Sequence, residues 1–565
     1  MAAKRIVVIG GSAAGPKAAA KARRTDQHAE IVLIQKGPDL SMASCGYPYY
    51  VGGTFDDRNQ LLSTPTGVVR DPKFYLNAKG IDARTLTEAT SIDRDAHTVT
   101  VKHLESGEEE TLPYDKLILA TGAKPILPPI PGADLEGITT LQSMADADYL
   151  RKVRDEKTVQ KAVIIGGGLI GMETCEALRL AGIEITVIEM LPQILKFLDW
   201  ELAKRLELYV KSQAAMVVTD NPVVEFLGKG GQLTGVKLKN GTELPCELAV
   251  VAVGVRPEST LAKEAGLAVG AIGGVTVDAH MRTSDPDIYA IGDCCEVTNL
   301  LTDRPCHMPM GDLANLQGRV AGQNVINGDT ESFPGTLLTG VCKIFDWTAG
   351  STGLNEAAAR EAGFNDITTV VTAMPDKPGF MGADLLIMKM IADNATGRLL
   401  GFQCIGPGDA SKRIAAAAMA IHGKLTVADL VNADLPYAPP FSAAIDAFVT
   451  TAHVLEDKLR GRMHGLPAPE FKRKLDAGDP MFILDVRGPD EFEQMRLGVG
   501  ETLVPLGALR GRLEDLPQDK STEIVCFCKI SLRGYEAQSF LESRGYTNVK
   551  VLEGGLMAWP YPREK

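Results

Sequence analysis

The sequence predicts an α/β protein in which two doubly wound parallel sheets are followed by an α+β region and a small α/β domain. Three observations support this fold class. The chain has 565 residues, too many for one hydrophobic core. A strand, a glycine turn, a helix and a second strand follow one another twice, from Arg5 and from Ala162. Residues 456–469 are polar and rich in glycine and proline, and an alternation of strands and helices follows them.

The first repeat is typical of a Rossmann-like βαβ unit. The apolar run 6–9 leads into a glycine turn, an alanine-rich helix and the strand 31–34. Small residues there let the backbone approach a pyrophosphate, and the helix N-terminus supplies amide donors. Ser12 replaces the usual middle glycine, and Gln35 stands where an acidic residue is usual, although an amide still bonds a ribose hydroxyl. We therefore predict an adenine dinucleotide site at Gly10, Ser12, Ala13, Ala14, Gly15, Gln35 and Lys36.

The second repeat carries the same pattern with an acidic residue in the expected place. The run 162–165 precedes a glycine turn, and Glu189 ends the next strand. A carboxylate there accepts hydrogen bonds from a ribose 2′-hydroxyl and repels a 2′-phosphate, which favours NADH over NADPH. An ordinary surface glutamate is the alternative. The predicted site comprises Gly166, Gly168, Ile170, Gly171, Glu189 and Gly254.

Composition excludes several classes of function. The formal net charge of −13 argues against nucleic acid or an anionic membrane as the main partner. No apolar run is long enough for a signal peptide or a membrane span, so we expect a cytoplasmic protein. The ten cysteines include no Cys-x-x-Cys pair, so they are expected as thiols, with no metal site.

Two further segments, each at the end of a predicted strand, contribute to a resemblance with a known protein family. Thr121 and Gly122 follow the segment 114–120, and Gly292 and Asp293 follow 287–291; the acidic side chain suits the ribityl hydroxyls of a flavin. With these segments, residues 1 to about 450 resemble the pyridine nucleotide-disulfide oxidoreductases. The resemblance implies FAD in the first site, which also includes Ala314, NADH in the second, and a homodimer. It predicts an FAD-binding domain at 1–148 and 271–328, an NADH-binding domain at 149–270, a dimerisation domain at 329–455 and a linker at 456–469.

A lone cysteine, Cys45, distinguishes the branch of this family. Many members have two cysteines four residues apart after the first βαβ unit, whereas here Cys45 has no neighbouring partner. Its oxidised form must be a mixed disulfide, a persulfide or a sulfenic acid. The segment resembles the single-cysteine branch of coenzyme A-disulfide reductases and NADH oxidases and peroxidases. A thiol near a helix N-terminus and a flavin is expected to be a thiolate at neutral pH. A buried structural thiol is the alternative.

Two positions separate the members of that branch. Ala13 stands where oxidases and peroxidases carry a histidine, which disfavours oxygen or peroxide chemistry. The segments around Lys412-Arg413 and Tyr437-Ala-Pro-Pro resemble the coenzyme A-disulfide reductases, in which that tyrosine reaches the partner's cysteine. Phe380 and Ile445 replace a tyrosine and a lysine of those enzymes, so coenzyme A disulfide is a less certain substrate than a persulfide. Basic and hydroxyl side chains that could contact coenzyme A are Arg23, Arg24, Ser41, Ser44, Lys412 and Arg413.

The last segment, 470–565, resembles a rhodanese domain. The motifs around Asp485-Val-Arg487, Cys528 and Gly554-Gly555 carry the resemblance, although a glycine–histidine turn of that family is degraded at 496–500. Loop amides, a helix N-terminus and Arg533 are expected to stabilise a thiolate or persulfide anion on Cys528. A non-catalytic interaction module is the alternative, and it usually lacks the loop cysteine.

Together these motifs predict an NADH-dependent flavoenzyme that reduces persulfides or polysulfides through Cys45, with coenzyme A persulfide as the favoured carrier. Cys528 would relay sulfane sulfur, and Tyr437 and Arg533 would assist the two cysteines. Three alternatives stay open: a coenzyme A-disulfide reductase, an NADH oxidase that uses Cys45 sulfenic acid, and a sulfurtransferase with an auxiliary flavin half. The expected partners are small sulfur substrates and coenzyme A.

Overall fold

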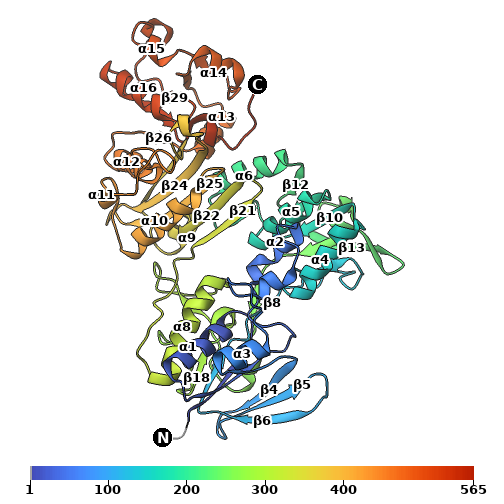
Figure 1. Ribbon diagram of the computed structural model, residues 1–565. Coiled ribbons are helices and arrows are strands. Elements are labelled where there is room, and N and C mark those ends of the chain that lie inside the picture. Colours follow the sequence, from blue (N-terminus) through green and yellow to red (C-terminus); the bar gives the residue numbers. More distant parts are fainter. Residues whose placement is uncertain (1–2, 565) are drawn as a thin grey trace. The chain divides into compact units, whose positions relative to one another are not determined.

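The computed structural model describes residues 3–564, and the chain separates into two compact units. The first unit comprises the residues up to 190 together with 221–336, and the second comprises 191–220 and the residues from 337 onwards. The mixed α/β class predicted from the sequence is confirmed in both units (Figure 1).

The first unit begins with a parallel sheet in the order β18-β7-β1-β2-β3. Val7 pairs with Val32 on one side and with Leu117 on the other, so the apolar strand β1 is covered on both edges and both faces. The strands are β1 (Arg5–Ile9), β2 (Glu30–Ile34), β3 (Asp82–Arg84), β7 (Lys116–Leu119) and β18 (Ile288–Ala290). A second, antiparallel sheet contains β4 (Thr87–Asp93), β5 (Thr98–His103) and β6 (Glu109–Pro113).

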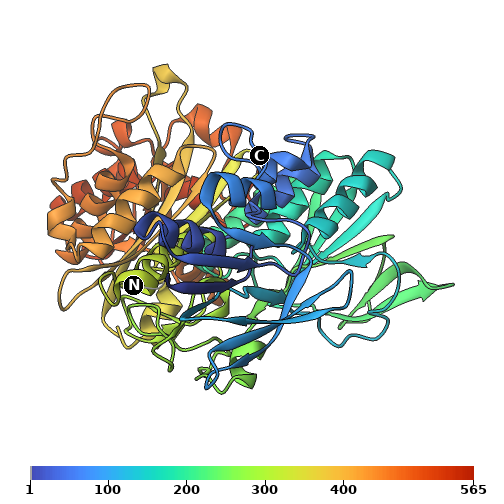
Figure 2. The same ribbon diagram turned by 60° about the horizontal axis from the view of Figure 1, so that its bottom comes forward.

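Helices α1 (Ala14–Thr25) and α8 (Gly311–Asn327) pack closely because α8 presents glycines to α1. A Cβ atom on Gly318 would lie 2.6 Å from the Ala14 carbonyl oxygen, and one on Gly322 would lie 2.4 Å from the Ala18 carbonyl oxygen. Figure 2 shows the dark blue helix α1 beside the strand β1 of the same colour. Other helices near this sheet are η1 (Ser44–Gly46), η2 (Arg58–Leu62), α3 (Pro72–Lys79), α7 (Thr260–Glu264) and η3 (Gly292–Cys294).

The second βαβ unit forms a parallel arrangement of β11, β10, β16 and β9. Helix α2 packs against the helices α4 and α5 of this region, which brings the segment after Cys45 next to the second glycine turn. The elements are α2 (Tyr47–Gly52), β9 (Ile138–Thr139), α4 (Met144–Glu156), β10 (Lys161–Ile165), α5 (Leu169–Leu180), β11 (Glu184–Ile188) and β16 (Leu248–Val251). Shorter pairings involve β13 (Val223–Lys229), β14 (Gln232–Leu238), β15 (Glu243–Pro245), β8 (Ala123–Pro125), β17 (Val255–Pro257), β19 (Val297–Thr298) and β20 (Pro305–Cys306).

The second unit is built on an antiparallel sheet in the order β21-β22-β25-β24-β23. Buried Lys389 on β24 pairs with Asp199, Glu201 and Glu356 at 3.0, 2.7 and 2.9 Å. Burial lowers the pKa of Lys389, but the three carboxylates outweigh it and raise the pKa overall, so the cluster fixes α6 on the sheet. The strands are β21 (Gly340–Ile344), β22 (Trp347–Gly353), β23 (Ile367–Pro375), β24 (Leu385–Asp393) and β25 (Leu399–Gly406). The remaining elements of this region are α6 (Trp200–Ser212), β12 (Ala215–Val218), α9 (Glu356–Glu361), η4 (Gly379–Met381), α10 (Ala410–His422), α11 (Val427–Leu430) and α12 (Ala447–Leu459).

The segment predicted as a linker, 456–469, is structured along much of its length. Helix α12 continues to Leu459, and β26 (Gly465–Leu466) already pairs with β30 of the C-terminal sheet. That sheet is parallel, in the order β26-β30-β29-β27-β28. Its elements are α13 (Ala468–Ala477), β27 (Phe482–Asp485), α14 (Pro489–Gln494), β28 (Thr502–Leu503), α15 (Leu506–Leu509), η5 (Leu513–Asp515), β29 (Ile524–Phe527), α16 (Leu532–Ser543), β30 (Val549–Leu552) and α17 (Gly555–Ala558).

Candidate active site

The first glycine turn is packed so tightly that two of its positions accept no side chain. Gly10 has φ +111°, and a Cβ atom on it would lie 2.0 Å from the Ala120 carbonyl oxygen. A Cβ atom on Gly15 would lie 1.9 Å from the Gly10 carbonyl oxygen. The turn therefore joins β1 to α1 without separating them, and it aims the helix N-terminus at the end of the sheet.

The second glycine turn has the same close packing at the two equivalent glycines. Gly166 has φ +109°, and a Cβ atom on it would lie 2.4 Å from the Ala252 carbonyl oxygen. A Cβ atom on Gly171 would lie 2.0 Å from the Gly166 carbonyl oxygen. In contrast, a Cβ atom on Gly168, the residue before α5, would meet no protein atom within 4 Å. The helix N-terminus thus borders open space, which fits a dinucleotide pyrophosphate.

The polar residue at the end of each second strand bonds the glycine turn. The Gly11 amide donates to Gln35 Oε1 at 2.9 Å, and the Gly167 amide donates to Glu189 Oε2 at 2.7 Å. Both side chains therefore lie beside their turns, where the ribose of a bound dinucleotide is expected.

Residues far apart in the chain meet at the end of the first sheet. A Cβ atom on Gly292 would lie 3.1 Å from the Ala14 Cβ and 3.7 Å from the Ala314 Cβ. Gly122 has φ +77° and borders open space. Burial raises the pKa of the neighbouring Asp293. These small residues and this carboxyl would suit a flavin dinucleotide at the N-terminal ends of α1 and α8.

Sequence reasoning missed Gln317 in this area. Its Oε1 accepts a 2.6 Å hydrogen bond from the Gly292 amide, although the side chain is buried on α8. The amide group fixes the turn that carries Asp293. A buried glutamine in a helix was the available signal, because such a side chain needs a hydrogen-bond partner.

Cys45 lies in η1, and its sulfur lies next to the first residue of α8. A Cβ atom on Gly311, the first residue of that helix, would lie 3.5 Å from Cys45 Sγ. The positive end of a helix favours a thiolate. Desolvation instead raises the pKa of the Cys45 thiol, and the carboxyls of Glu173, Asp293 and Asp312 raise it further. The thiolate expected at neutral pH is therefore opposed by burial and by three acidic groups.

Glu173 on α5 is a second residue that the sequence reasoning missed. Burial raises its pKa to about 7, against the opposing effect of a hydrogen bond from the Tyr49 hydroxyl to Oε1 at 3.4 Å. The sequence signal was a glutamate in the first turns of the helix that follows the second glycine turn. A carboxyl whose pKa is raised to about 7, in the helix after the second glycine turn and near Cys45, is typical of a functional site.

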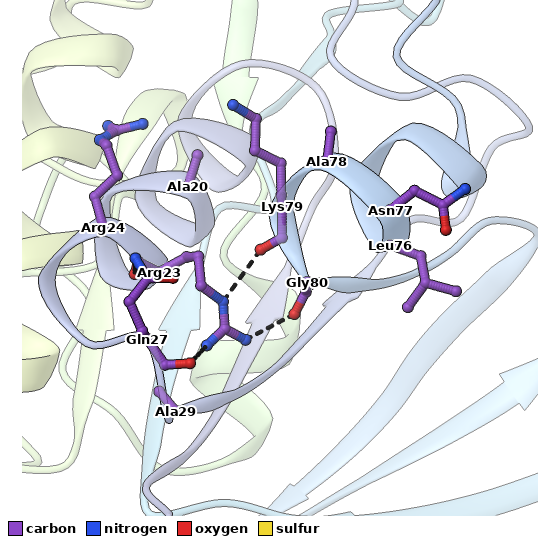
Figure 3. A pocket seen from close by; sticks show the side chains of 10 residues that line it. All are labelled: Ala20, Arg23, Arg24, Gln27, Ala29, Leu76, Asn77, Ala78, Lys79 and Gly80. Carbon is purple, nitrogen blue, oxygen red and sulfur yellow. Dashed lines mark hydrogen bonds between the residues drawn. The ribbon is translucent and has the colours of Figure 1, made fainter.

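The two arginines predicted to contact coenzyme A have different surroundings. Arg23 donates to the backbone carbonyls of Lys79 and Gly80 at 3.1 and 2.7 Å, and to that of Gln27 at 2.8 Å (Figure 3). Arg24 is exposed, and both Arg24 and Lys79 are among the residues that line a hollow of about 590 Å³ (Figure 3). Arg23 therefore joins the ends of α1 and α3, and Arg24 keeps its charge available.

Ser41 and Ser44 lie on the segment that leads to Cys45. The Ser41 amide donates to the Gly11 carbonyl at 2.7 Å, which ties this segment to the first glycine turn. Arg70, which the sequence analysis did not single out, donates to Ser41 Oγ at 3.0 Å. The basic side chain of Arg70 thus contacts the segment that leads to Cys45.

Three predicted residues of the second unit have separate roles. Arg413 is buried and bonds both oxygens of Asp446, at 3.1 and 2.8 Å, so it is a core ion pair and not a surface phosphate ligand. Lys412 Nζ donates to the Phe441 carbonyl at 3.2 Å and lies 3.4 Å from Asp446. Tyr437 lies in the loop between α11 and α12 and is exposed.

Cys528 directly follows β29, and a short loop leads from it into α16, as expected. The thiol is fully buried. Arg533, expected to stabilise this thiol, bonds Glu491 through two parallel contacts of 2.7 and 2.8 Å. Those bonds raise the pKa of Arg533, Cys528 raises it further, and the pKa of Glu491 falls to about 2. The guanidinium is therefore held by the Glu491 carboxylate, within electrostatic range of the sulfur.

A buried pair orients that carboxylate. Arg487 Nε and Nη2 bond Asp485 at 3.0 and 2.7 Å, and Arg487 Nη1 donates to the Glu491 carbonyl at 3.0 Å. The motif that suggested a rhodanese domain thus positions the partner of Arg533. Cys526, two residues before Cys528, lies in the same core cluster as Cys528, because residues two apart along a strand share one face.

No helix within residues 3–564 is long and apolar enough to cross a membrane. The same described residues contain no group of three or more histidine, cysteine, aspartate or glutamate side chains placed to hold a metal ion.

Comparisons with known proteins match this geometry. Residues 4–311 match the family described as pyridine nucleotide-disulphide oxidoreductase, and 339–448 match its dimerisation domain. Residues 467–560 match the rhodanese-like domain.

Similar proteins cover most of the chain. A solved NAD-dependent persulfide reductase from A. fulgidus is 41% identical, with a TM-score of 0.93 over 98% of this chain and 100% of the other. The reduced Bacillus anthracis CoADR-RHD structure is 35% identical, with a TM-score of 0.91 over 99% and 98%. The NAD(P)H coenzyme A polysulfide/persulfide reductase of Pyrococcus horikoshii is 32% identical over 80% of this chain and 98% of its own length. The resemblance seen in the sequence is confirmed: the chain belongs to the pyridine nucleotide-disulphide oxidoreductase family and also carries a rhodanese-like domain.

Proposed function

We propose that the protein is an NADH-dependent reductase of persulfides and polysulfides, with coenzyme A persulfide as the favoured carrier. One observation carries this proposal: a single chain holds a lone thiol beside a flavin cradle and a second, rhodanese-type cysteine. All ten cysteines are free, so Cys45 has no internal disulfide partner. A lone thiol is suited to attack a sulfur–sulfur bond and to hold one sulfur atom at a time.

The chemistry follows from the thiol. Cys45 thiolate attacks the outer sulfur of R–S–SH, the carrier leaves as R–S⁻, and Cys45 holds a persulfide. Bound FAD would supply the path by which two electrons from NADH reach this sulfur–sulfur bond. Cleavage of that bond restores the Cys45 thiolate and releases hydrosulfide, so one NADH is oxidised for each persulfide reduced. The start of α8 at Gly311 favours the anionic sulfur in both states.

The choice of NADH rests on Glu189. Its carboxylate lies against the second glycine turn, where it would accept a ribose hydroxyl bond and repel a 2′-phosphate. The first turn has the neutral Gln35 in the same relation to Gly11, which suits FAD.

Coenzyme A recognition is assigned to basic groups around α1. Arg24 and Lys79 line one hollow. Arg23, Arg70 and Arg413 are not retained as phosphate ligands, because their guanidinium groups bond the protein itself. Lys412 remains a weaker candidate, since it is close to Asp446.

We propose a cytoplasmic homodimer. The match to a dimerisation domain and the exposed apolar side chains Phe380, Tyr437 and Phe441 support subunit association. In such a dimer Tyr437 would serve the partner's cysteine as a hydrogen-bond donor to the leaving thiolate. The free cysteines suit a reducing compartment.

A coenzyme A-disulfide reductase is the second candidate, because it would use the same Cys45 and the same basic hollow. The exposed Phe380 lacks the hydroxyl that those enzymes place in this motif, which favours the smaller persulfide. An oxidase is disfavoured by Ala13, since no histidine stands in the first turn.

The test compares Cys45→Ser and Cys528→Ser in the FAD-loaded protein, with coenzyme A persulfide and polysulfide as substrates. We expect Cys45→Ser to abolish NADH consumption and hydrosulfide release, and Cys528→Ser to leave reduction of coenzyme A persulfide intact. Full activity of Cys45→Ser would contradict the proposal. Steady NADH consumption with oxygen alone would favour the oxidase instead.

A further inference from the structure

A buried glutamate connects the rhodanese-like domain to the dimerisation domain. Glu553 directly follows β30, and its residue is only 1% exposed. Glu553 Oε2 accepts a 3.0 Å bond from the Val371 amide on β23, and Oε1 pairs with Lys458 Nζ of α12 at 2.5 Å. Lys458 Nζ also donates to the Thr369 carbonyl at 2.8 Å. A buried carboxylate needs such partners, so its position is strongly determined.

The two residues after Glu553 bring the chain onto the Cys528 loop. Gly554 and Gly555 have φ +66° and +57°, conformations that favour glycine. A Cβ atom on Gly555 would lie 2.5 Å from the Cys528 carbonyl oxygen and 2.8 Å from the Ser531 amide nitrogen. Only glycine permits this approach, so the segment that starts at Glu553 supports the loop directly.

Helix α17 then determines the orientation of the loop peptides. The Leu556 and Met557 amides donate to the carbonyls of Cys528 and Lys529, each at 3.0 Å. In a trans peptide the N–H points opposite to the carbonyl. The N–H groups of Lys529 and Ile530 therefore point away from α17, towards the inside of the loop that begins at Cys528.

The other end of α17 is held from outside its own domain as well. Arg205 of α6 donates from Nε to the Met557 carbonyl at 3.0 Å, and its guanidinium lies 5.6 Å from the ring centroid of Trp347 on β22. The support of the Cys528 loop is thus anchored on the dimerisation domain at Glu553 and on α6 at Met557.

We propose that Glu553 is a positioning residue for sulfur transfer at Cys528, because it fixes the support of the loop amides on the dimerisation domain. This inference rests on the proposed role of Cys528. In that step the Cys528 thiolate attacks the outer sulfur of a donor R–S–SH, R–S⁻ leaves, and no electrons are gained or lost. Aligned loop amides stabilise the anionic sulfur, so displacement of α17 lowers both the thiolate fraction and the transfer rate.

The experiment uses the FAD-loaded full chain with Glu553→Gln. The Gln side chain keeps an oxygen for the Val371 amide but loses the charge that pairs with Lys458. Sulfur transfer is measured with polysulfide as donor and cyanide as acceptor. The pH dependence of Cys528 alkylation is measured in a Cys45→Ser background. We expect kcat to fall about tenfold with little change in KM, and the alkylation midpoint to rise by about one pH unit.

Lys474→Met is the matched control, because it removes the 2.7 Å ion pair with Glu523 from the same domain without a contact to α17. It should change neither quantity, and NADH oxidation by ferricyanide should be normal in both variants. An unchanged kcat and midpoint in Glu553→Gln would overturn the inference. So would an equal effect of Lys474→Met.

Two further variants test the second anchor of α17 and the role of Cys528 itself. If Glu553→Gln does not fold, Arg205→Met tests the other anchor with the same expected changes, and unchanged kinetics there would again overturn the inference. Cys528→Ser separates the proposed role of Cys528 in sulfur transfer from the positioning role of Glu553. Sulfur transfer that persists in Cys528→Ser contradicts the proposed role of Cys528, whereas transfer lost in Cys528→Ser but normal in Glu553→Gln contradicts only the positioning role.

Discussion

Cys45 Sγ lies 3.5 Å from the point where a Cβ atom on Gly311 would stand. The first residue of α8 is thus in contact range of the thiol, and its lack of a side chain leaves space beside the sulfur. A persulfide on Cys45 needs room for one more sulfur atom.

Gly311→Ala should lower persulfide turnover while the fold is preserved. The methyl group makes an ordinary contact with Sγ but occupies the space beside it, so we expect kcat with polysulfide to fall about tenfold. NADH oxidation by ferricyanide, which does not need Cys45, serves as the control and should be unchanged. Normal polysulfide turnover in this variant would show that the second sulfur lies elsewhere.

Glu173→Gln should remove a pH-dependent loss of stability. Burial raises the folded-state pKa of Glu173 from 4.5 to about 7, so the folded protein keeps a proton that the unfolded chain releases. The free energy of unfolding of the wild type therefore falls as pH rises through this window. Above it, the glutamine variant should be more stable by roughly 1–2 kcal/mol. Denaturant unfolding of the FAD-loaded proteins at pH 5 and pH 8 measures this, and an equal difference at both values would refute it.

Glu189→Gln should weaken the proposed preference for NADH over NADPH. An amide oxygen can still accept the Gly167 bond, as Gln35 accepts the Gly11 bond in the first turn, so the turn is preserved. Loss of the negative charge removes the repulsion of a 2′-phosphate. We expect the ratio of kcat/KM for NADPH to that for NADH to rise about tenfold. Steady-state kinetics with both nucleotides tests this, and an unchanged ratio would place the discrimination in another residue.

Arg24→Ala and Arg23→Ala should affect different properties. Arg24→Ala should change the KM for the carrier, and Arg23→Ala should change the stability of the protein. Arg24 is exposed beside the hollow, so its loss should raise KM for coenzyme A persulfide about tenfold without affecting inorganic polysulfide. Arg23 bonds backbone carbonyls, so its loss should lower the free energy of unfolding by about 1–3 kcal/mol. Equal KM values for the two substrates in Arg24→Ala would exclude this hollow as the carrier site.

Much of the fold could be predicted from the sequence because its signals are local. Strand runs buried on both faces, glycine turns and the spacing of Glu189 are readable within a single βαβ unit. The rhodanese-like domain was recognisable for the same reason, since Asp485, Cys528 and Gly554 occur in continuous motifs. Within the segment 456–469, Gly465 begins β26 and Pro469 lies in the first turn of α13. The pairing of Gly465 with Val551 is a long-range contact that the local sequence does not show.

The sequence by itself determined the reactive groups available to this protein: two glycine turns typical of dinucleotide sites, a lone Cys45 and a second cysteine, Cys528, in a rhodanese-like motif. Only the tertiary structure decided which charged groups are available for that chemistry. Arg413 is neutralised in the core by Asp446, and Arg533 is held by Glu491. Burial likewise moves the pKa of Glu173 to about 7. The physical reason is that the charge state and hydrogen bonding of a side chain depend on neighbours far away in the sequence, whereas glycine turns and strand patterns depend on neighbours nearby.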